Sequence, residues 1–290
     1  RERRRGPRRR NPRMKPTPPD ILAPALGAGE APPSEFAGWW TAFVTLLIKE
    51  VLRFARIWIQ TILPPAVTTA LYFVIFGKLL GAQLPPMDDI GYPQYIAPGL
   101  IMLAIITNSY ANVVSSFYGS KFQHNIEELL VAPMPNWLIL AGFVGGGVVR
   151  GLAVGVVVTA IALAFTDLHV THWGVTVAVV FLTAVLFSLA GLINGIYANS
   201  FDDIAIVPTF VLTPLTYLGG IFYSINLLPD FWQNVSLVNP ILYMVNAFRY
   251  GILGVSDIGM LQAFSLIGAF VLGLGAFALW LLKRGVGIRN

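Results

Sequence analysis

Long apolar runs separated by short polar stretches make up most of the chain after residue 35. A helix needs roughly 20 apolar residues to cross a bilayer, and it satisfies its own backbone hydrogen bonds inside lipid. The alternation that membrane-barrel strands require is not visible. The sequence therefore predicts an all-α membrane protein with six transmembrane helices, at about residues 57–77, 95–118, 137–165, 173–198, 204–223 and 261–282.

Residues 36–56, before the first span, mix apolar and charged positions. The aromatic side chains come first, and Lys49, Glu50, Arg53 and Arg56 follow at spacings that place a polar face on one side of a helix. This pattern predicts an interfacial helix, with a water-exposed start to the first span as the alternative.

The stretch before the last span is apolar but broken by two prolines, and it carries three charged residues. Within residues 224–260 these are Pro229, Pro240, Asp230, Arg249 and Asp257. Two short re-entrant helices explain this pattern better than a seventh span. A seventh span would place the basic C-terminus on the side that is poor in lysine and arginine.

The composition agrees with a protein dissolved in lipid. Of 290 residues, 56% are hydrophobic and 11% are charged, and the mean hydropathy is +0.71. A soluble domain of this size needs far more charge to cover its surface. The chain has no cysteine, which excludes a disulfide framework, thiolate metal sites and cysteine nucleophiles.

Residues 1–35 open with RERRRGPRRRNPRMK and continue through proline-rich and alanine-rich sequence. Without periodicity they predict a disordered basic cytoplasmic tail that contacts anionic membrane lipids. Because no aromatic residues are interleaved and no folded module presents the charges, we expect no nucleic-acid binding. The first apolar run lies too far downstream and is too long for a signal peptide.

Lysine and arginine near the span ends predict the orientation. Seven lie on the side of the termini and two on the other side, and cytoplasmic loops carry the excess. The seven are Lys49, Arg53, Arg56, Lys121, Lys283, Arg284 and Arg289, and the two are Lys78 and Arg249. Both termini, and the loop after the second span, are therefore expected in the cytoplasm.

That loop, KFQHNIEELLVAPMP at residues 121–135, concentrates charge between two apolar runs. Ile126, Leu129 and Leu130 fall within one helical turn of each other, and carboxylates flank them. Such an apolar ridge suits a groove on a partner protein, whereas the alternative is an ordinary solvated loop. Pro133 and Pro135 end the short helix before the third span.

Motifs for catalysis are missing from the sequence. There is no GxxxxGK[ST] phosphate loop, GxSxG elbow or HExxH motif, so no ATP hydrolysis is expected in this chain. His124, His169 and His172 fall in predicted loops, with Asp167 as a carboxylate neighbour of the last two. We expect loop residues there rather than metal ligands.

Arg150 is a charge well inside an apolar run, in GFVGGGVVRGLAVGVVV. A cation in lipid is costly and faces a cavity, a partner or the bundle interior. Arg150 therefore either lines a transport path, or it snorkels or pairs with a carbonyl or carboxylate group and so locks helices together. The surrounding glycines favour close helix packing in both cases.

Polar residues accompany prolines in the second and fifth predicted spans. They either line a translocation path, together with Arg150, or join helices by hydrogen bonds, including helices across a dimer interface. These residues are Thr107, Asn108, Tyr110, Asn112, Thr209, Thr213, Pro214, Thr216 and Tyr217.

The chain resembles the permease subunits of bacterial ABC-2-type ATP-binding-cassette exporters over residues 36–290. The most specific similarity lies in NIEELLVAPMPNWLILAGFVGGGVVRG and in the stretch that begins FDDIAIVPTFVLTPLTYLGG and runs to residue 254; residues 54–77 and 95–117 add to it. The resemblance implies an inner-membrane homodimer on two separate ATPase subunits, which would bind ATP and magnesium. It also implies a coupling helix at Asn125, Ile126, Glu127, Glu128, Leu129, Leu130, Val131, Ala132 and Pro133.

Three functions remain open at this stage. The first is a permease that exports a lipid-linked, glycan or hydrophobic substrate and is driven by the separate ATPase. The second is an ion-coupled carrier or channel, which would need acidic residues inside the spans, whereas Asp202 and Asp203 lie at a cytoplasmic turn. The third, an intramembrane enzyme, lacks a recognisable catalytic set.

Overall fold

Five helices in the described residues are long and apolar enough to cross a membrane. The computed structural model describes residues 35–81, 83, 90–131 and 134–287. The first candidate span is α2 (Trp58–Tyr72), which continues into the π-helix η1 (Phe73–Leu80). The other four are α3 (Tyr92–Phe122), α5 (Asn136–Phe165), α6 (Trp173–Tyr197) and α11 (Met260–Arg284). They coincide with five of the six predicted spans.

The chain divides into two units, Arg1–Gly38 and Trp39–Asn290. Of the first unit only residues 35–38, the start of α1 (Glu35–Arg56), are described, so the predicted basic tail lies almost wholly outside the described residues. The second unit holds all other helices.

The predicted fifth span, 204–223, is shorter than expected. The helix there is built from α7 (Asp203–Val207), the π-helix η2 (Pro208–Leu212) and α8 (Thr213–Tyr217), of five residues each. It stops at Tyr217, and Gly220 then adopts a φ of 70°, in the left-handed region that favours glycine. The predicted helix end at residue 223 is therefore wrong, and an α-helix of this length reaches only about 22 Å of a roughly 30 Å hydrocarbon core.

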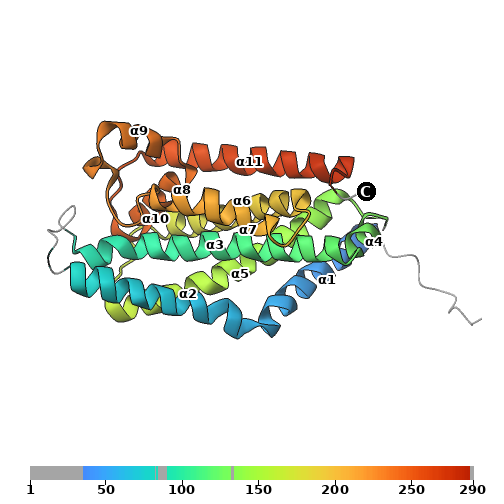
Figure 1. The fold of residues 1–290 in the computed structure, drawn as a ribbon, viewed down its shortest axis with the longest axis horizontal. Helices are drawn as coiled ribbons and strands as arrows, with labels where there is room; N and C mark the ends of the chain where they lie inside the picture. The colour runs from blue at the N-terminus through green and yellow to red at the C-terminus, as the bar shows by residue number, and fades with distance from the viewer. Residues whose placement is uncertain (1–34, 82, 84–89, 132–133, 288–290) are drawn as a thin grey trace, which may run out of the picture. The chain divides into compact units, whose positions relative to one another are not determined.

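Short helices occupy the region before α11. They are the 3₁₀ turn η3 (Ile225–Leu227), α9 (Asp230–Leu237) and α10 (Pro240–Leu253). The two prolines that interrupt this stretch stand at helix starts: Pro229 precedes α9 and Pro240 is the first residue of α10. The prediction of two short helices is confirmed at the level of secondary structure. They lie at the opposite end of the unit from α4 (Asn125–Val131) and from the end of α11 (Figure 1).

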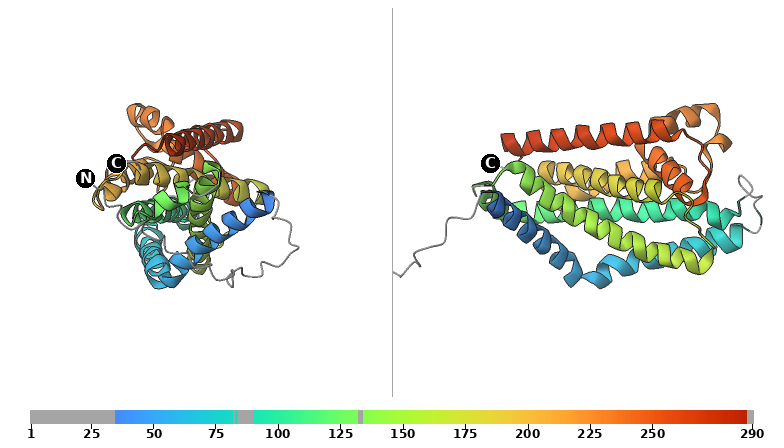
Figure 2. Two further views of the ribbon diagram at one scale, coloured as in Figure 1. Left: turned by 90° about the vertical axis from the view of Figure 1, so that its right-hand side faces the viewer. Right: turned by 180° about the vertical axis from the view of Figure 1, so that it is seen from behind.

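The core of the second unit is centred on α3, with α5, α6 and α10 packed around it (Figures 1 and 2). Nearly every turn of α3 is buried. Glycines on α5 allow its neighbours to approach closely: a Cβ on Gly155 would lie 2.8 Å from the Ile105 Cγ1 of α3, and one on Gly146 would lie 2.5 Å from the Glu50 Cβ of α1. The predicted packing role of these glycines is confirmed.

Gly191 on α6 offers a direct test of that packing. A Cβ there would lie 2.6 Å from the carbonyl oxygen of Tyr110, a backbone atom of α3 that no rotamer change can move. Gly191→Ala is expected to destabilise the protein by about 1–3 kcal/mol, measured by thermal unfolding in detergent. Gly174, on the same helix, has nothing within 4 Å of a Cβ, so Gly174→Ala is expected to be neutral or slightly stabilising. Equal unfolding temperatures for the two variants would contradict the packing.

Candidate functional site

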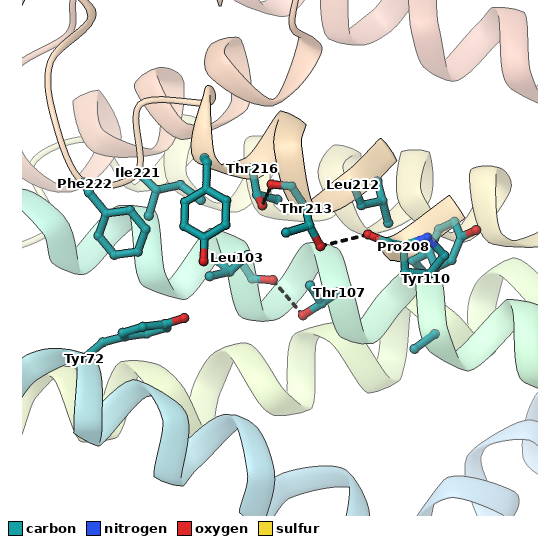
Figure 3. A pocket seen from close by; sticks show the side chains of 12 residues that line it. Tyr72, Leu103, Thr107, Tyr110, Pro208, Leu212, Thr213, Thr216, Ile221 and Phe222 are labelled. Atoms are coloured by element: carbon teal, nitrogen blue, oxygen red, sulfur yellow. Dashed lines mark hydrogen bonds between the residues drawn. The ribbon is translucent and has the colours of Figure 1, made fainter. Parts of the chain in front are cut away.

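A cavity of about 330 Å³ opens between α2, α3 and the α7–α8 segment. Five predicted path residues lie on its wall, namely Thr107, Tyr110, Thr213, Thr216 and Tyr217. The other lining residues are Tyr72, Leu103, Ala111, Pro208, Leu212, Ile221 and Phe222. Figure 3 shows Thr107 and Leu103 of α3 facing the α8 side chains, with Tyr72 reaching in from α2. The wall is therefore mainly aromatic and aliphatic, with a few hydroxyl groups.

A second cavity of about 280 Å³ adjoins the first. It shares Tyr72, Leu103 and Thr107 with the first cavity, and its remaining wall comes from α2 and from the middle of α3. Those residues are Pro64, Pro65, Thr68, Thr69, Leu100, Ala104 and Asn108. Asn108 thus joins the predicted residues that line a cavity.

Two π-helical turns border the first cavity. Tyr72 directly precedes η1, and Pro208 begins η2. Because proline has no backbone N–H, Pro208 and Pro214 interrupt the regular series of helical backbone hydrogen bonds. The Thr213 hydroxyl donates to the Pro208 carbonyl oxygen at 2.9 Å. Turns of this kind are frequent at functional sites. This segment is consequently an irregular helical wall of the cavity.

Three predicted path residues lie elsewhere. Thr209 and Pro214 are exposed and are not among the residues that line either cavity. Asn112 is buried in a polar cluster with α1. Lipid-facing and cavity-facing positions alternate within one helical turn, and composition alone does not distinguish them.

A buried ionic cluster, Glu50 and Arg53 of α1 with Asn112 and Ser116 of α3, corrects the expected polar face of α1. The side chain of Glu50 is 1% exposed and accepts a hydrogen bond from the Ser116 hydroxyl at 2.7 Å. Arg53 Nε donates to Glu50 at 3.3 Å, and Arg53 Nη2 donates to the Asn112 Oδ1 at 2.8 Å and to its carbonyl oxygen at 3.0 Å. These two charges bind α1 to α3, and Glu50 is shielded from water whereas the Arg53 side chain is 31% exposed.

The sequence did contain a signal for this burial. Leu46, Glu50 and Phe54 are spaced four residues apart, so they form one stripe on the helix, and all three are buried. The two apolar neighbours place the carboxylate on the packed face.

Arg150 lies at the middle of α5 and is half-buried. Its Nη2 donates to the Asn108 Oδ1 at 3.4 Å, a long hydrogen bond, and its Nε is buried without a partner. The acceptor is the side-chain amide carbonyl of Asn108 on the cavity wall, so this hydrogen bond joins α5 to α3 and leaves both predicted roles of Arg150 open.

Arg249 on α10 is a second buried arginine, 1% exposed. Its Nη2 donates to the Gly220 carbonyl oxygen at 2.6 Å, and its guanidinium carbon lies 4.0 Å from the centre of the Tyr95 ring. Its Nη1 is 3.5 Å from the Asn246 Oδ1, which in turn accepts from the Asp257 amide at 3.1 Å. Arg249 thus ties α10 to α3 and to the bend that follows α8.

A short helix, α4, occupies the position of the predicted coupling helix, but the apolar side chains described there face inward. Ile126 is 1% exposed in the core, and Leu129 packs against that core. The side chain of Leu130 and residues 132–133 lie outside the described residues. The exposed face of α4 carries Glu127, Glu128 and Val131. The ridge is therefore used to hold α4 on its own bundle, because a seven-residue helix has little other means of staying folded.

Two polar loop features hold the end of the bundle near α4. Lys121 Nζ donates to the carbonyl oxygens of Ile196 and Ala198 at 3.0 and 2.7 Å, at the C-terminal end of α6. The backbone amides of Asn199 and Ser200 donate to the Asp203 Oδ2 at 2.8 and 3.1 Å, and the Asp203 amide donates to the Ser200 hydroxyl at 3.1 Å. Asp203 is thus a turn-capping carboxylate.

The histidines give no sign of a metal site. The His172 ring stacks on the Tyr250 ring with centroids 4.5 Å apart, and no cluster of three metal-ligating side chains occurs in the part of the chain that the structure describes.

Several membrane-length helices around a packed central helix, with an aromatic and hydroxyl-lined cavity between them, are the features of a multi-pass helical membrane protein. The chain belongs to the ABC-2 type transporter family, whose model matches residues 41–253. It is accordingly a permease of an ABC transporter and not an enzyme. This family implies an ABC ATPase partner in general.

Known relatives agree with this assignment. The inner membrane transport permease YadH of Escherichia coli (strain K12) is 54% identical over 252 residues, which cover 87% of this chain and 98% of YadH. Nodulation protein J of Rhizobium leguminosarum bv. viciae is 22% identical over 210 residues, covering 71% of this chain and 80% of that protein. Together with the apolar helices, the first relative supports a multi-pass inner membrane protein.

Proposed function

We propose that this chain is the permease half of an exporter that moves a lipid-linked, glycan or hydrophobic substrate across the bacterial inner membrane. Two copies form the path, and each pairs with a separate ATPase subunit that binds ATP and magnesium. The observation that carries the proposal is the 330 Å³ cavity of aromatic, aliphatic and threonine side chains inside the bundle. Such walls bind amphiphilic molecules through apolar contacts and a few placed hydroxyl groups.

The topology belongs to the same proposal. The Asp203–Tyr217 segment, together with the turn after it, serves as a sixth, irregular span, so that both termini and α4 face the cytoplasm. Irregular backbone is tolerated at membrane depth where it lines a cavity, and this segment lines one. α9 and α10 then re-enter the membrane from the other side, and α1 lies at the interface.

The homodimer rests on apolar surface that the single chain leaves uncovered. Large exposed side chains follow one face of α2, among them Leu63, Val67 and Leu71, and Phe210 and Val211 of η2 are exposed as well. Both elements border the cavity. Pairing through them would enclose the cavity between two copies, whereas lipid would cover the remaining apolar surface.

An ion-coupled carrier is the second candidate, because Glu50 is an acidic group buried in the bundle. Both of its carboxylate oxygens are already paired, one with Ser116 and the other with Arg53. An ion would have to displace these donors, so the ATP-driven permease is favoured.

Filling the cavity tests the proposed path. Thr213→Trp, which puts an indole into the cavity, is expected to reduce ATP-driven efflux from cells that carry the permease and its ATPase by about tenfold or more. Thr209→Trp is the matched control, because Thr209 is on the same segment, is exposed, and does not line the cavity. Equal efflux by both variants, at equal membrane levels, would overturn the assignment of this cavity to the path.

A further inference from the structure

Arg150 is under-paired for a charge at the middle of a membrane-length helix. Its hydrogen bond to Asn108 is 3.4 Å long, and the Nε is buried with no partner. An unsatisfied buried donor destabilises the folded protein, and more so when it belongs to a charged group. Charged residues in spans face partners or cavities because lipid cannot solvate them. The Nε of Arg150 therefore lacks a hydrogen-bond acceptor.

The protein itself does not supply that acceptor within the described residues. Glu50, on α1, already accepts from Ser116 and from Arg53. Arg53 repels the positive charge of Arg150 rather than balancing it. Two arginines and one glutamate leave this region with an excess positive charge.

Arg150 is not among the residues that line either cavity, and Asn108 connects its charge to the smaller one. Its side chain lines the 280 Å³ cavity, and its Oδ1 is the group that Arg150 contacts. Its Nδ2 donates to the Ala104 carbonyl oxygen at 3.0 Å, which fixes the amide orientation toward Arg150. Thr68 and Thr107 add hydroxyl groups to the same wall, and Tyr72 joins this cavity to the larger apolar one.

We propose that Arg150, with Asn108 and the threonine hydroxyls of this wall, binds the phosphate group of an anionic amphiphile whose apolar part occupies the adjoining cavity. The guanidinium group offers a fork of N–H donors that matches phosphate oxygens. The inference rests on the proposed function, since it treats the two cavities as the substrate path, and it narrows the substrate class to molecules that carry a phosphate.

If Arg150 is purely structural and only bridges α3 and α5, the response of the protein to added ligand should be the same in wild type and in Asn108→Asp. Asn108→Asp places a carboxylate beside the Arg150 guanidinium group, so that the protein itself balances the positive charge. A structural bridge would then be strengthened, and the protein would remain at least as stable. A phosphate site would be lost, because the added carboxylate competes for Arg150 and repels the ligand.

The test is thermal unfolding of the full chain in detergent micelles, titrated with dioleoyl phosphatidic acid, with dioleoyl phosphatidylcholine or with inorganic phosphate. Ligand binding to the folded state raises the unfolding temperature. We expect phosphatidic acid, but not phosphatidylcholine, to stabilise the wild-type protein. Arg150→Gln and Asn108→Asp should each weaken this apparent affinity by about tenfold, whereas Arg284→Gln, at an exposed position on α11, should not.

The comparison among variants removes the contribution of the basic tail, which is the same in all of them. If inorganic phosphate stabilised the protein as strongly as phosphatidic acid does, the site would bind free phosphate, and the proposal of an amphiphilic ligand would be overturned. Unchanged phosphatidic acid binding by Arg150→Gln, or equal stabilisation by phosphatidylcholine, would overturn the site itself. The assay uses no ATPase, so its failure is separate from the efflux result with Thr213→Trp.

Discussion

Arg249→Ala is expected to leave most of the permease unfolded, with a loss of about 3–5 kcal/mol. The substitution empties a fully buried site and leaves the Gly220 carbonyl oxygen without its 2.6 Å donor. It also removes the cation held 4.0 Å above the Tyr95 ring. Because this side chain contacts both α3 and the bend after α8, its loss should loosen the packing of α10 on both. The yield of monodisperse protein and its unfolding temperature in detergent measure the effect.

Arg284→Ala is the control, because Arg284 is exposed near the end of α11 and contacts the Trp280 ring at 4.8 Å. Its effect should stay within about 0.5 kcal/mol. Arg249→Lys should fall between the two, since an ammonium group keeps the charge but lacks the fork that reaches two acceptors. If Arg249→Ala unfolds at the same temperature as Arg284→Ala, the tie between α10 and α3 is wrong.

The helical pattern of this protein could be predicted from sequence wherever apolar runs are long. Five predicted spans appear as helices because a run of that length has one low-energy form in lipid. The end of the helix in the segment after Asp203 was harder to predict, because the segment is as apolar as the other spans. Two prolines and the Gly219–Gly220 pair decide where this helix ends. Local backbone chemistry overrode hydropathy there.

Buried charges were the main failure of prediction. Arg249 was counted as a charge outside the spans, and Glu50 was assigned to a solvated face, yet both are 1% exposed. A charge can be buried when donors or acceptors from distant segments meet it, and those segments lie 29 and 66 residues away in the two cases. Such partners are invisible to a local pattern. Removing Arg53 and Arg249 from the count of basic residues keeps the predicted asymmetry in the same direction.

The candidate site was predicted in part for the same reason. Proline and threonine in one short stretch marked the segment that lines the cavity, but Thr209 and Thr213 lie in the same chemical context and only the second reaches the wall. On α4 the spacing of Ile126 and Leu129 predicted a ridge correctly. The partner of that ridge is the bundle itself, which the spacing does not specify.

Changing the charge on the exposed face of α4 should uncouple the permease from its ATPase without disturbing the fold. Glu128→Arg and Val131→Asp change the exposed face of α4, where Val131 is 86% exposed, and leave the buried Ile126 untouched. If this face binds the ATPase, each change should lower permease-stimulated ATP hydrolysis by about tenfold, the loss of ~1.4 kcal/mol at the interface. Hydrolysis is measured with the purified complex in lipid vesicles.

The sites of substitution matter, because Leu129 is unsuitable for this test. Leu129→Asp would place a charge against the core, release α4 from the bundle, and lower both stability and coupling. Asp230→Arg on α9 is the matched control: it reverses an exposed charge at the opposite end of the unit, away from the proposed ATPase side. Normal hydrolysis in Glu128→Arg and Val131→Asp, at wild-type unfolding temperatures, would remove α4 as the coupling element. Equal loss in Asp230→Arg would show that charge reversal acts without regard to place, because no ATPase can contact both ends of the bundle at once.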